Sequence, residues 1–184
     1  MARPREFDEE EALHRAMMAF WRLGYDGASL PDLLEAMGLT RGSLYKAFTD
    51  KKSLFLRALH AYDCTAVEAA VAALTRNGAG RSQVISLFQS VVDDVAGGDR
   101  RGCMLCSAAA GPAAVDAEIK AAVEAILARL HQGFAAAVPN LGSAGAVVLV
   151  TQYVGLRVLA RAGLPVTTLQ ASVDGMVGML VEDG

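Results

Sequence analysis

The sequence predicts an all-α protein of about nine helices. Apolar residues recur along much of the chain at the i, i+3, i+4, i+7 spacing that places them on one face of a helix. The periodic segments end at glycine or proline, and several begin at a serine, threonine or aspartate that can cap a helix. No segment shows the strand pattern, in which apolar and polar residues alternate at period two between hairpin turns.

The first predicted helix starts after Asp8. The glutamates at 9–11 put negative charge in its first turn, where the positive end of the helix dipole stabilises it. We expect Gly24 to end this helix. Its buried stripe consists of Leu13, Met17, Phe20 and Trp21.

The second helix is predicted over residues 30–37. Ser29 is a good N-cap, Pro31 stands in the first turn where a missing donor costs little, and Asp32 completes a capping-box pattern. Gly38 follows where a helix end needs a residue tolerant of positive φ. The apolar stripe of this helix consists of Leu30, Leu33, Leu34 and Met37.

The third helix begins after Thr40, so the turn between the two helices is only a few residues long. Such a short connection with a glycine is typical of a helix-turn-helix, whose second helix enters the major groove of DNA. On a helical wheel of residues 41–48, one side is apolar and the other is small, cationic and hydroxyl-bearing. The apolar side holds Leu44, Ala47 and Phe48; the other side and its flanks hold Arg41, Gly42, Ser43, Tyr45 and Lys46.

This free face has the chemistry needed for duplex DNA. Arg41 and Lys46 can bind guanine edges or phosphates, Gly42 allows close approach, and Ser43 and Tyr45 can donate to phosphates. Residues 41–57 contain five basic side chains and one acidic side chain, a local charge of +4 in a chain of net charge −3. We therefore expect the phosphate backbone to lie along this segment.

From Phe7 to Leu56 the chain resembles the DNA-binding domain of TetR/AcrR-family transcriptional repressors. The resemblance implies that residues 1–50 form a three-helix DNA-binding domain and residues 51–184 a helical domain for ligand binding and dimerisation. It also implies a flexible basic arm at Arg3 and Arg5. The resemblance implies that Ser29 and Thr40 cap helices against phosphates, that Arg41, Gly42 and Lys46 face the bases, and that Tyr45 and Lys51 contact the DNA backbone. The Ser43 hydroxyl remains a phosphate contact expected from its chemistry alone.

Six further helices are predicted after the motif. A long helix at 51–74 would join the DNA-binding domain to the rest of the chain and ends before a glycine-rich break at 77–80. The remaining helices are expected at about 81–96, 103–110, 113–137, 143–162 and 166–181.

The last two predicted helices are unusually apolar. The only charges in 143–162 are Arg157 and Arg161, and the only charge in 166–181 is Asp174. Such helices can form an internal core. The family resemblance implies instead that they form a four-helix dimer interface, consistent with a two-fold DNA site.

An inducer site is expected among the central helices, where glycines, alanines and methionines leave room. The same residues also fit an ordinary core. The candidate ligand contacts are Phe88, Val92, Cys103, Met104, Ser107, Phe134, Gln152, Tyr153 and Leu156.

The segment around Cys103 and Cys106 suggests a thiol sensor as an alternative. These cysteines lie three residues apart at a helix N-terminus beside Arg100 and Arg101, which would favour the thiolate. Buried cysteines are usually inert, so a structural role is the competing interpretation. A metal site built on the i, i+4 pair of His60 and Cys64 lacks a clear fourth ligand, and we predict neither metal nor cofactor.

Enzymatic function is not expected. The chain has no phosphate-binding glycine loop after a strand, no H-E-x-x-H and no G-x-S-x-G motif.

The composition of the chain, with 53% hydrophobic and 20% charged residues, suits a packed soluble fold rather than disorder. The longest apolar run, 144–150, is far shorter than the roughly 18 residues of a membrane span.

Three cysteines without an apolar signal region favour reduced thiols and a cytoplasmic location. The sequence thus predicts a dimeric repressor that binds a pseudo-palindromic operator and is released by a small-molecule inducer. The less favoured alternatives are a thiol-sensing repressor and a helical adaptor that binds no DNA.

Overall fold

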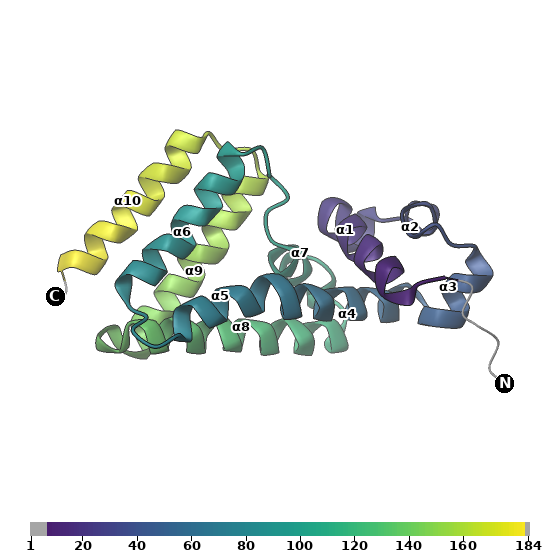
Figure 1. Ribbon diagram of the computed structural model, residues 1–184, viewed down its shortest axis with the longest axis horizontal. Helices are drawn as coiled ribbons and strands as arrows, with labels where there is room; N and C mark the ends of the chain where they lie inside the picture. Colours follow the sequence, from purple (N-terminus) through teal and green to yellow (C-terminus); the bar gives the residue numbers. More distant parts are fainter. Residues whose placement is uncertain (1–6, 183–184) are drawn as a thin grey trace.

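The computed structural model describes residues 7–182 and contains ten α-helices in that range, with no strand there (Figure 1). The all-α prediction is confirmed. The predicted basic arm at Arg3 and Arg5 lies outside the described residues. The helices are α1 (Glu9–Gly27), α2 (Leu30–Met37), α3 (Arg41–Phe48), α4 (Lys51–Tyr62), α5 (Glu68–Thr75), α6 (Arg81–Ala96), α7 (Met104–Ala110), α8 (Ala117–Ala137), α9 (Gly142–Arg161) and α10 (Val166–Glu182).

The predicted helix at 51–74 is present, but a π-helical turn divides it. Residues Asp63–Val67 form this turn between α4 and α5, so the two α-helices and the turn make one connecting helix. Counted that way, the described chain has the nine predicted helices. In Figure 1 the connecting helix and α8 run alongside each other on the long axis of the molecule.

The first helix and α8 differ from their predicted bounds. Gly24 has φ 78° and interrupts α1 as expected, but one more helical turn follows to Gly27. The segment predicted as a helix from residue 113 instead begins with a short 3-10 turn, Pro112–Ala114. The α-helix starts only after Asp116, because its carboxylate accepts from the backbone N–H groups of Glu118 and Ile119 at 3.0 and 3.1 Å.

Two hydrophobic clusters form the interior. The first joins α1–α5 to α7 and to the N-terminal part of α8, with Phe20, Phe55 and Tyr62 among its buried rings. The second holds α6, α9, α10 and the C-terminal part of α8 around Phe88 and Phe134. The helices of the predicted DNA-binding domain therefore share a core with the regulatory helices, and the domain boundary at residue 50 remains a prediction.

One helix of the described chain keeps a broad apolar surface. The segment Pro139–Arg161 is long and apolar enough to cross a membrane by length and composition alone, and only 28% of its most apolar window is buried. Core helices of soluble proteins pass the same test. Its exposed large apolar side chains are Val147, Val148, Val158 and Leu159.

Candidate nucleic-acid interface and its regulatory contacts

The second helix is held by the capping box that the sequence predicts. The backbone N–H of Asp32 donates to Ser29 Oγ at 3.3 Å, and Ser29 N donates to Asp32 Oδ2 at 2.8 Å. Both donations from Ser29 to the carboxylate lower the pKa of Asp32, the side-chain one more strongly. Gly38 takes the left-handed conformation, with φ 66°, and ends α2.

The third helix presents the polar face that the helical wheel predicts. Thr40 caps it by accepting from Ser43 N at 3.3 Å, and the two hydroxyls lie 3.0 Å apart. Leu44 and Phe48 are buried in the first core cluster, and Ala47 packs against that cluster. The residues that remain exposed on α3 are Arg41, Gly42, Tyr45 and Lys46, with Ser43 half-buried.

A strained turn connects α3 to α4. Thr49 has φ 64° and ψ −60°, and Asp50 N donates to Phe48 O at 2.6 Å across it, which makes a γ-turn. Asp50 then caps α4 by accepting from Ser53 N at 2.7 Å. This conformation could not be expected from the sequence, because threonine rarely adopts positive φ.

Part of the predicted basic cluster in residues 41–57 makes contacts within the protein and is therefore less available for DNA phosphates than the sequence implied. Lys51 Nζ lies 4.7 Å from the centroid of the Tyr25 ring, a cation–π contact at the N-terminus of α4. Lys52 instead pairs with Asp116 and Glu118 at 3.5 and 2.9 Å.

Arg57 is also engaged within the protein. Its guanidinium lies over the Phe48 ring and pairs with Glu9 at 2.8 Å. Among the described residues, Arg41 and Lys46 have no ion-pair partner. The local charge of +4 is thus partly compensated, and the basic side chains of this cluster that have no ion-pair partner among the described residues are Arg41, Lys46 and Lys51.

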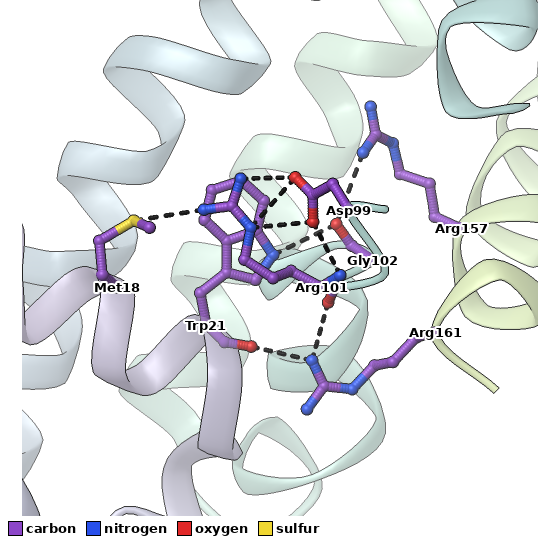
Figure 2. A network of polar contacts seen from close by, with 7 residues as sticks. All are labelled: Met18, Trp21, Asp99, Arg101, Gly102, Arg157 and Arg161. Carbon is purple, nitrogen blue, oxygen red and sulfur yellow. Dashed lines mark hydrogen bonds and ion pairs between the residues drawn. The ribbon is translucent and has the colours of Figure 1, made fainter. Parts of the chain in front are cut away.

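A polar contact joins α1 to the loop before α7 (Figure 2). The Trp21 indole donates to Gly102 O at 3.2 Å, and the Arg101 guanidinium lies 4.2 Å from the centroid of the Trp21 ring. Arg101 also pairs with Asp99 at 2.5 Å and donates to Met18 Sδ at 3.5 Å. The hydrogen bond from Arg101 lowers the pKa of Asp99, which keeps its carboxylate charged at neutral pH.

The last residue of α9 reaches the same region. Arg161 donates to Trp21 O and Arg101 O at 2.8 Å each, and to Arg22 O at 3.0 Å. Carbonyl groups near a helix end need external donors, and the Gly24 break places that end here. Arg161 therefore caps α1 from the regulatory helices.

Gly102 is required at the centre of this contact. It has φ 70°, and a Cβ atom would lie 2.8 Å from Arg161 Cβ and 3.0 Å from Arg157 O. Only glycine provides both the conformation and the space. The sequence alone does not reveal this requirement, because Arg157 and Arg161 are distant from Gly102 along the chain.

The structure places most of the nine candidate ligand residues inside the core. The rings of Phe88, Phe134 and Tyr153 pack edge to face, with centroids 5.5–6.1 Å apart. Val92, Leu156, Cys103 and Met104 are buried. Ser107 donates to Cys103 O at 3.3 Å. Gln152 lines an apolar cavity of about 200 Å³ between α9 and α10, where its Oε1 atom is buried without a partner.

A different cavity lies beside the Trp21 contact. It measures about 210 Å³ and contains none of the nine predicted residues. The available sequence signal was the pair of isolated arginines in the apolar α9 segment, since both Arg157 and Arg161 face this region. The aromatic and charged side chains that line this cavity are Trp21, Tyr62, Asp94, Asp99, Arg101 and Arg157.

The Cys103 thiol is set in an unusual environment. Tyr62 Oη donates to Cys103 Sγ at 3.3 Å. Hydrogen bonding from Cys106, then from Tyr62, together with the positive charge of Arg157, lowers the pKa of Cys103 to about 6 despite its burial. The same hydrogen bond, with burial, raises the pKa of Cys106. The alternative acceptor for the Cys106 thiol, Val154 O, is distant at 3.9 Å.

The His60 and Cys64 pair is exposed on the connecting helix. Cys64 Sγ lies 3.6 Å from His60 Nε2. No group of three or more metal-ligating side chains occurs within residues 7–182.

Residues 12–58 match the family model of bacterial regulatory proteins of the tetR family. Two curated relatives resemble the chain over shorter stretches. An uncharacterised HTH-type transcriptional regulator, YezE of Bacillus subtilis, is 34% identical over 110 residues, which are 59% of this chain and 57% of the relative. The HTH-type transcriptional repressor ComR of Escherichia coli is 47% identical over 60 residues, 33% of this chain and 29% of the relative.

A solved structure is similar over nearly the whole chain. It is the TetR-family transcriptional regulator CifR, a cysteine mutant complexed with 26-bp double-strand operator DNA. The two are 30% identical with a TM-score of 0.73, over 96% of this chain and 98% of CifR.

Proposed function

Because this chain belongs to the TetR family of transcriptional regulators, which are not enzymes, we propose that it binds operator DNA as a homodimer and represses transcription until an inducer releases it. The observation that carries the proposal is the exposed face of α3, where Arg41 and Lys46 stand without ion-pair partners among the described residues. The CifR complex with operator DNA and the repressor name of ComR support it.

The eight predicted DNA contacts divide into two roles in this proposal. Arg41, Gly42 and Lys46 face the bases. The remaining residues contact the phosphate backbone of the DNA and so position the protein on it, because phosphate contacts set the register of a protein on DNA. They are Ser29, Thr40, Ser43, Tyr45 and Lys51.

The exposed apolar surface of α9 supports the dimer. Val147 and Val148 are 53% and 50% exposed, and Val158 and Leu159 are 48% and 39% exposed. A second copy of α9 and α10 would cover these side chains in a two-fold interface. The two α3 helices would then reach successive major grooves, about 34–36 Å apart or somewhat more.

Release by an inducer would use the connecting helix. Lys52 near its start contacts the N-terminus of α8, and Tyr62 lines the cavity farther along. A ligand that prefers one tilt of this helix would change the spacing of the two α3 helices. By linkage, operator DNA must weaken ligand binding by the same factor.

Substitutions in α3 and α4 test the interface. A duplex selected by the wild-type protein from a random-sequence pool provides the specific site, and an unselected duplex provides the reference. Arg41→Ala and Lys46→Ala should each cost about 1–3 kcal/mol on the selected duplex, with a smaller loss on the reference. Lys51→Ala should weaken both and reduce the salt slope by about one.

Lys52→Ala is the matched control, because its ammonium already pairs with Asp116 and Glu118. It should leave the salt slope unchanged. The stoichiometry of the complex should be an even number of chains per site. Equal losses on both duplexes for Arg41→Ala and Lys46→Ala, or one chain per site, would contradict the proposal.

A second candidate trigger is the Cys103 thiol. The observation in its favour is the Tyr62 hydrogen bond to a thiol whose pKa is lowered to about 6, since the thiolate is the reactive form. In this mechanism the Cys103 thiolate adds to an activated alkene, forming a C–S bond, and water protonates the resulting carbanion. The low exposure of Cys103, 6%, favours the non-covalent inducer instead.

N-ethylmaleimide distinguishes the two triggers in a Cys64→Ser background, which removes the exposed thiol. If Cys103 is the trigger, the reagent should release DNA, with a rate that rises through pH 6 as the thiolate forms. A variant that also carries Cys103→Ser and Cys106→Ser should stay bound. Equal release from both proteins would exclude the thiols.

A further inference from the structure

The cavity beside Trp21 lies where the DNA-binding and regulatory helices meet. Trp21 comes from α1, Tyr62 from the end of α4, Val91 from α6 and Arg157 from α9. An occupant would therefore touch both predicted domains at once. Its volume of about 210 Å³ exceeds the roughly 150 Å³ of a cavity known to hold benzene, so a molecule of benzoate size fits.

Arg157 carries a positive charge that no carboxylate of the described residues balances. Its guanidinium makes a long hydrogen bond to Gly102 O at 3.5 Å and lies 4.9 Å from the centre of the Tyr153 ring, and its charge also helps to lower the pKa of Cys103. No carboxylate within the described residues forms an ion pair with it. A guanidinium presents several donors in a plane suited to a carboxylate, so most of its hydrogen-bonding capacity is unused.

The other charges around the cavity do not compensate Arg157. Asp99 and Arg101 pair with each other at 2.5 Å and together carry no net charge. Asp94 is exposed, so water screens its carboxylate. The cavity lining thus contains one guanidinium without a carboxylate partner, next to the neutral Tyr62 hydroxyl and the Trp21 ring, and Cys103 is not part of this lining.

From this arrangement we propose that the cavity is an effector site for a small monocarboxylate, bound by Arg157. The effector role rests on the proposed function, in which an inducer releases operator DNA. The proposed function does not specify the chemical class of that inducer or where it binds. The carboxylate takes a bidentate hydrogen bond from Arg157, and its carbon skeleton lies toward Trp21 and Tyr62.

The contacts of Gly102 connect this site to α1. Gly102 O accepts from both Arg157 and the Trp21 indole, at 3.5 and 3.2 Å. A carboxylate that binds the Arg157 guanidinium would replace the weak hydrogen bond from Arg157 to Gly102 O. It would also press against the Trp21 ring and displace it. Because Trp21 lies on α1, which packs on α2 and α4, the displacement reaches the DNA-binding helices.

The test uses carboxylates of two to eight carbons, benzoate among them, each paired with its neutral amide. Thermal shift and calorimetry on the protein without DNA measure binding. At least one carboxylate should bind at millimolar concentration or better, its amide at least tenfold more weakly, and Arg157→Gln should abolish binding. Arg76→Gln, which changes an exposed arginine outside the cavity, should bind as the wild type does.

Three results would overturn the inference: no carboxylate binds, amides bind equally well, or binding persists in Arg157→Gln. A second arm measures affinity for the selected duplex with and without the bound carboxylate. Reduced affinity in the wild type but not in Arg157→Gln is expected, and unchanged affinity would remove the effector role. If the wild type selects no duplex, the proposed function fails. The thermal-shift and calorimetric measurements without DNA still show whether the cavity binds a carboxylate.

Discussion

Gly102→Ala is expected to destabilise the protein by roughly 2–6 kcal/mol, because it combines two costs. An alanine at φ 70° is strained by about 1–3 kcal/mol. Its Cβ would also meet Arg161 Cβ at 2.8 Å and Arg157 O at 3.0 Å, and relieving such overpacking costs about 1–3 kcal/mol more. Denaturant unfolding followed by circular dichroism measures the sum.

Gly98→Ala provides a matched control for Gly102→Ala. Gly98 also has positive φ, 94°, in the same loop, but nothing lies within 4 Å of its Cβ position. It should show only the strain cost of about 1–3 kcal/mol. The difference between the two variants reports the steric cost at the α1 contact, and equal destabilisation would show that the loop tolerates the extra atom.

Arg129→Ala is the second substitution with a large expected effect, about 2–4 kcal/mol of destabilisation. Arg129 on α8 donates to Asp63 Oδ2 at 2.6 Å, and Asp63 stands in the π-turn with a side chain only 12% exposed. Asp63 Oδ1 is buried without a partner, so removing Arg129 leaves a carboxylate with no compensation. Because the Arg129 side chain is 36% exposed, the expected loss of stability is smaller than for a fully buried ion pair.

A double-substitution cycle isolates the Asp63–Arg129 pair. Asp63→Asn in the Arg129→Ala background should recover part of the loss, since it removes the uncompensated charge. Glu68→Gln tests the outer partner of Arg129, whose side chain is 55% exposed, and should cost less than about 1 kcal/mol. If Arg129→Ala alone unfolds no more easily than the wild type, the pair does not stabilise the π-turn.

Local chemistry explains why the helix-turn-helix could be predicted from sequence. Ser29, Asp32, Thr40 and Gly38 act within one turn of their own backbone, so their identities specify where α2 and α3 begin and end. The exposed face of α3 follows from its helical period and needs no information about distant residues.

The cavity and the contact around Gly102 could not be predicted in this way. They bring together residues far apart in sequence, such as Trp21 with Gly102 and Arg161 with Arg22. The predicted ligand residues were chosen for apolar character, which core and pocket residues share, and the structure packs Phe88, Phe134 and Tyr153 against one another.

The sequence by itself determined the helical class, the capped helices of the DNA-binding motif and the polar face of α3, because these depend on periodicity and on hydrogen bonds within a few residues. Only the tertiary structure decided which charges remain unpaired. Lys52 and Arg57 are compensated by Glu118 and Glu9 from other helices, whereas Arg157 meets no carboxylate in the described chain. Charge compensation depends on distance in space, and spacing along the chain does not specify that distance.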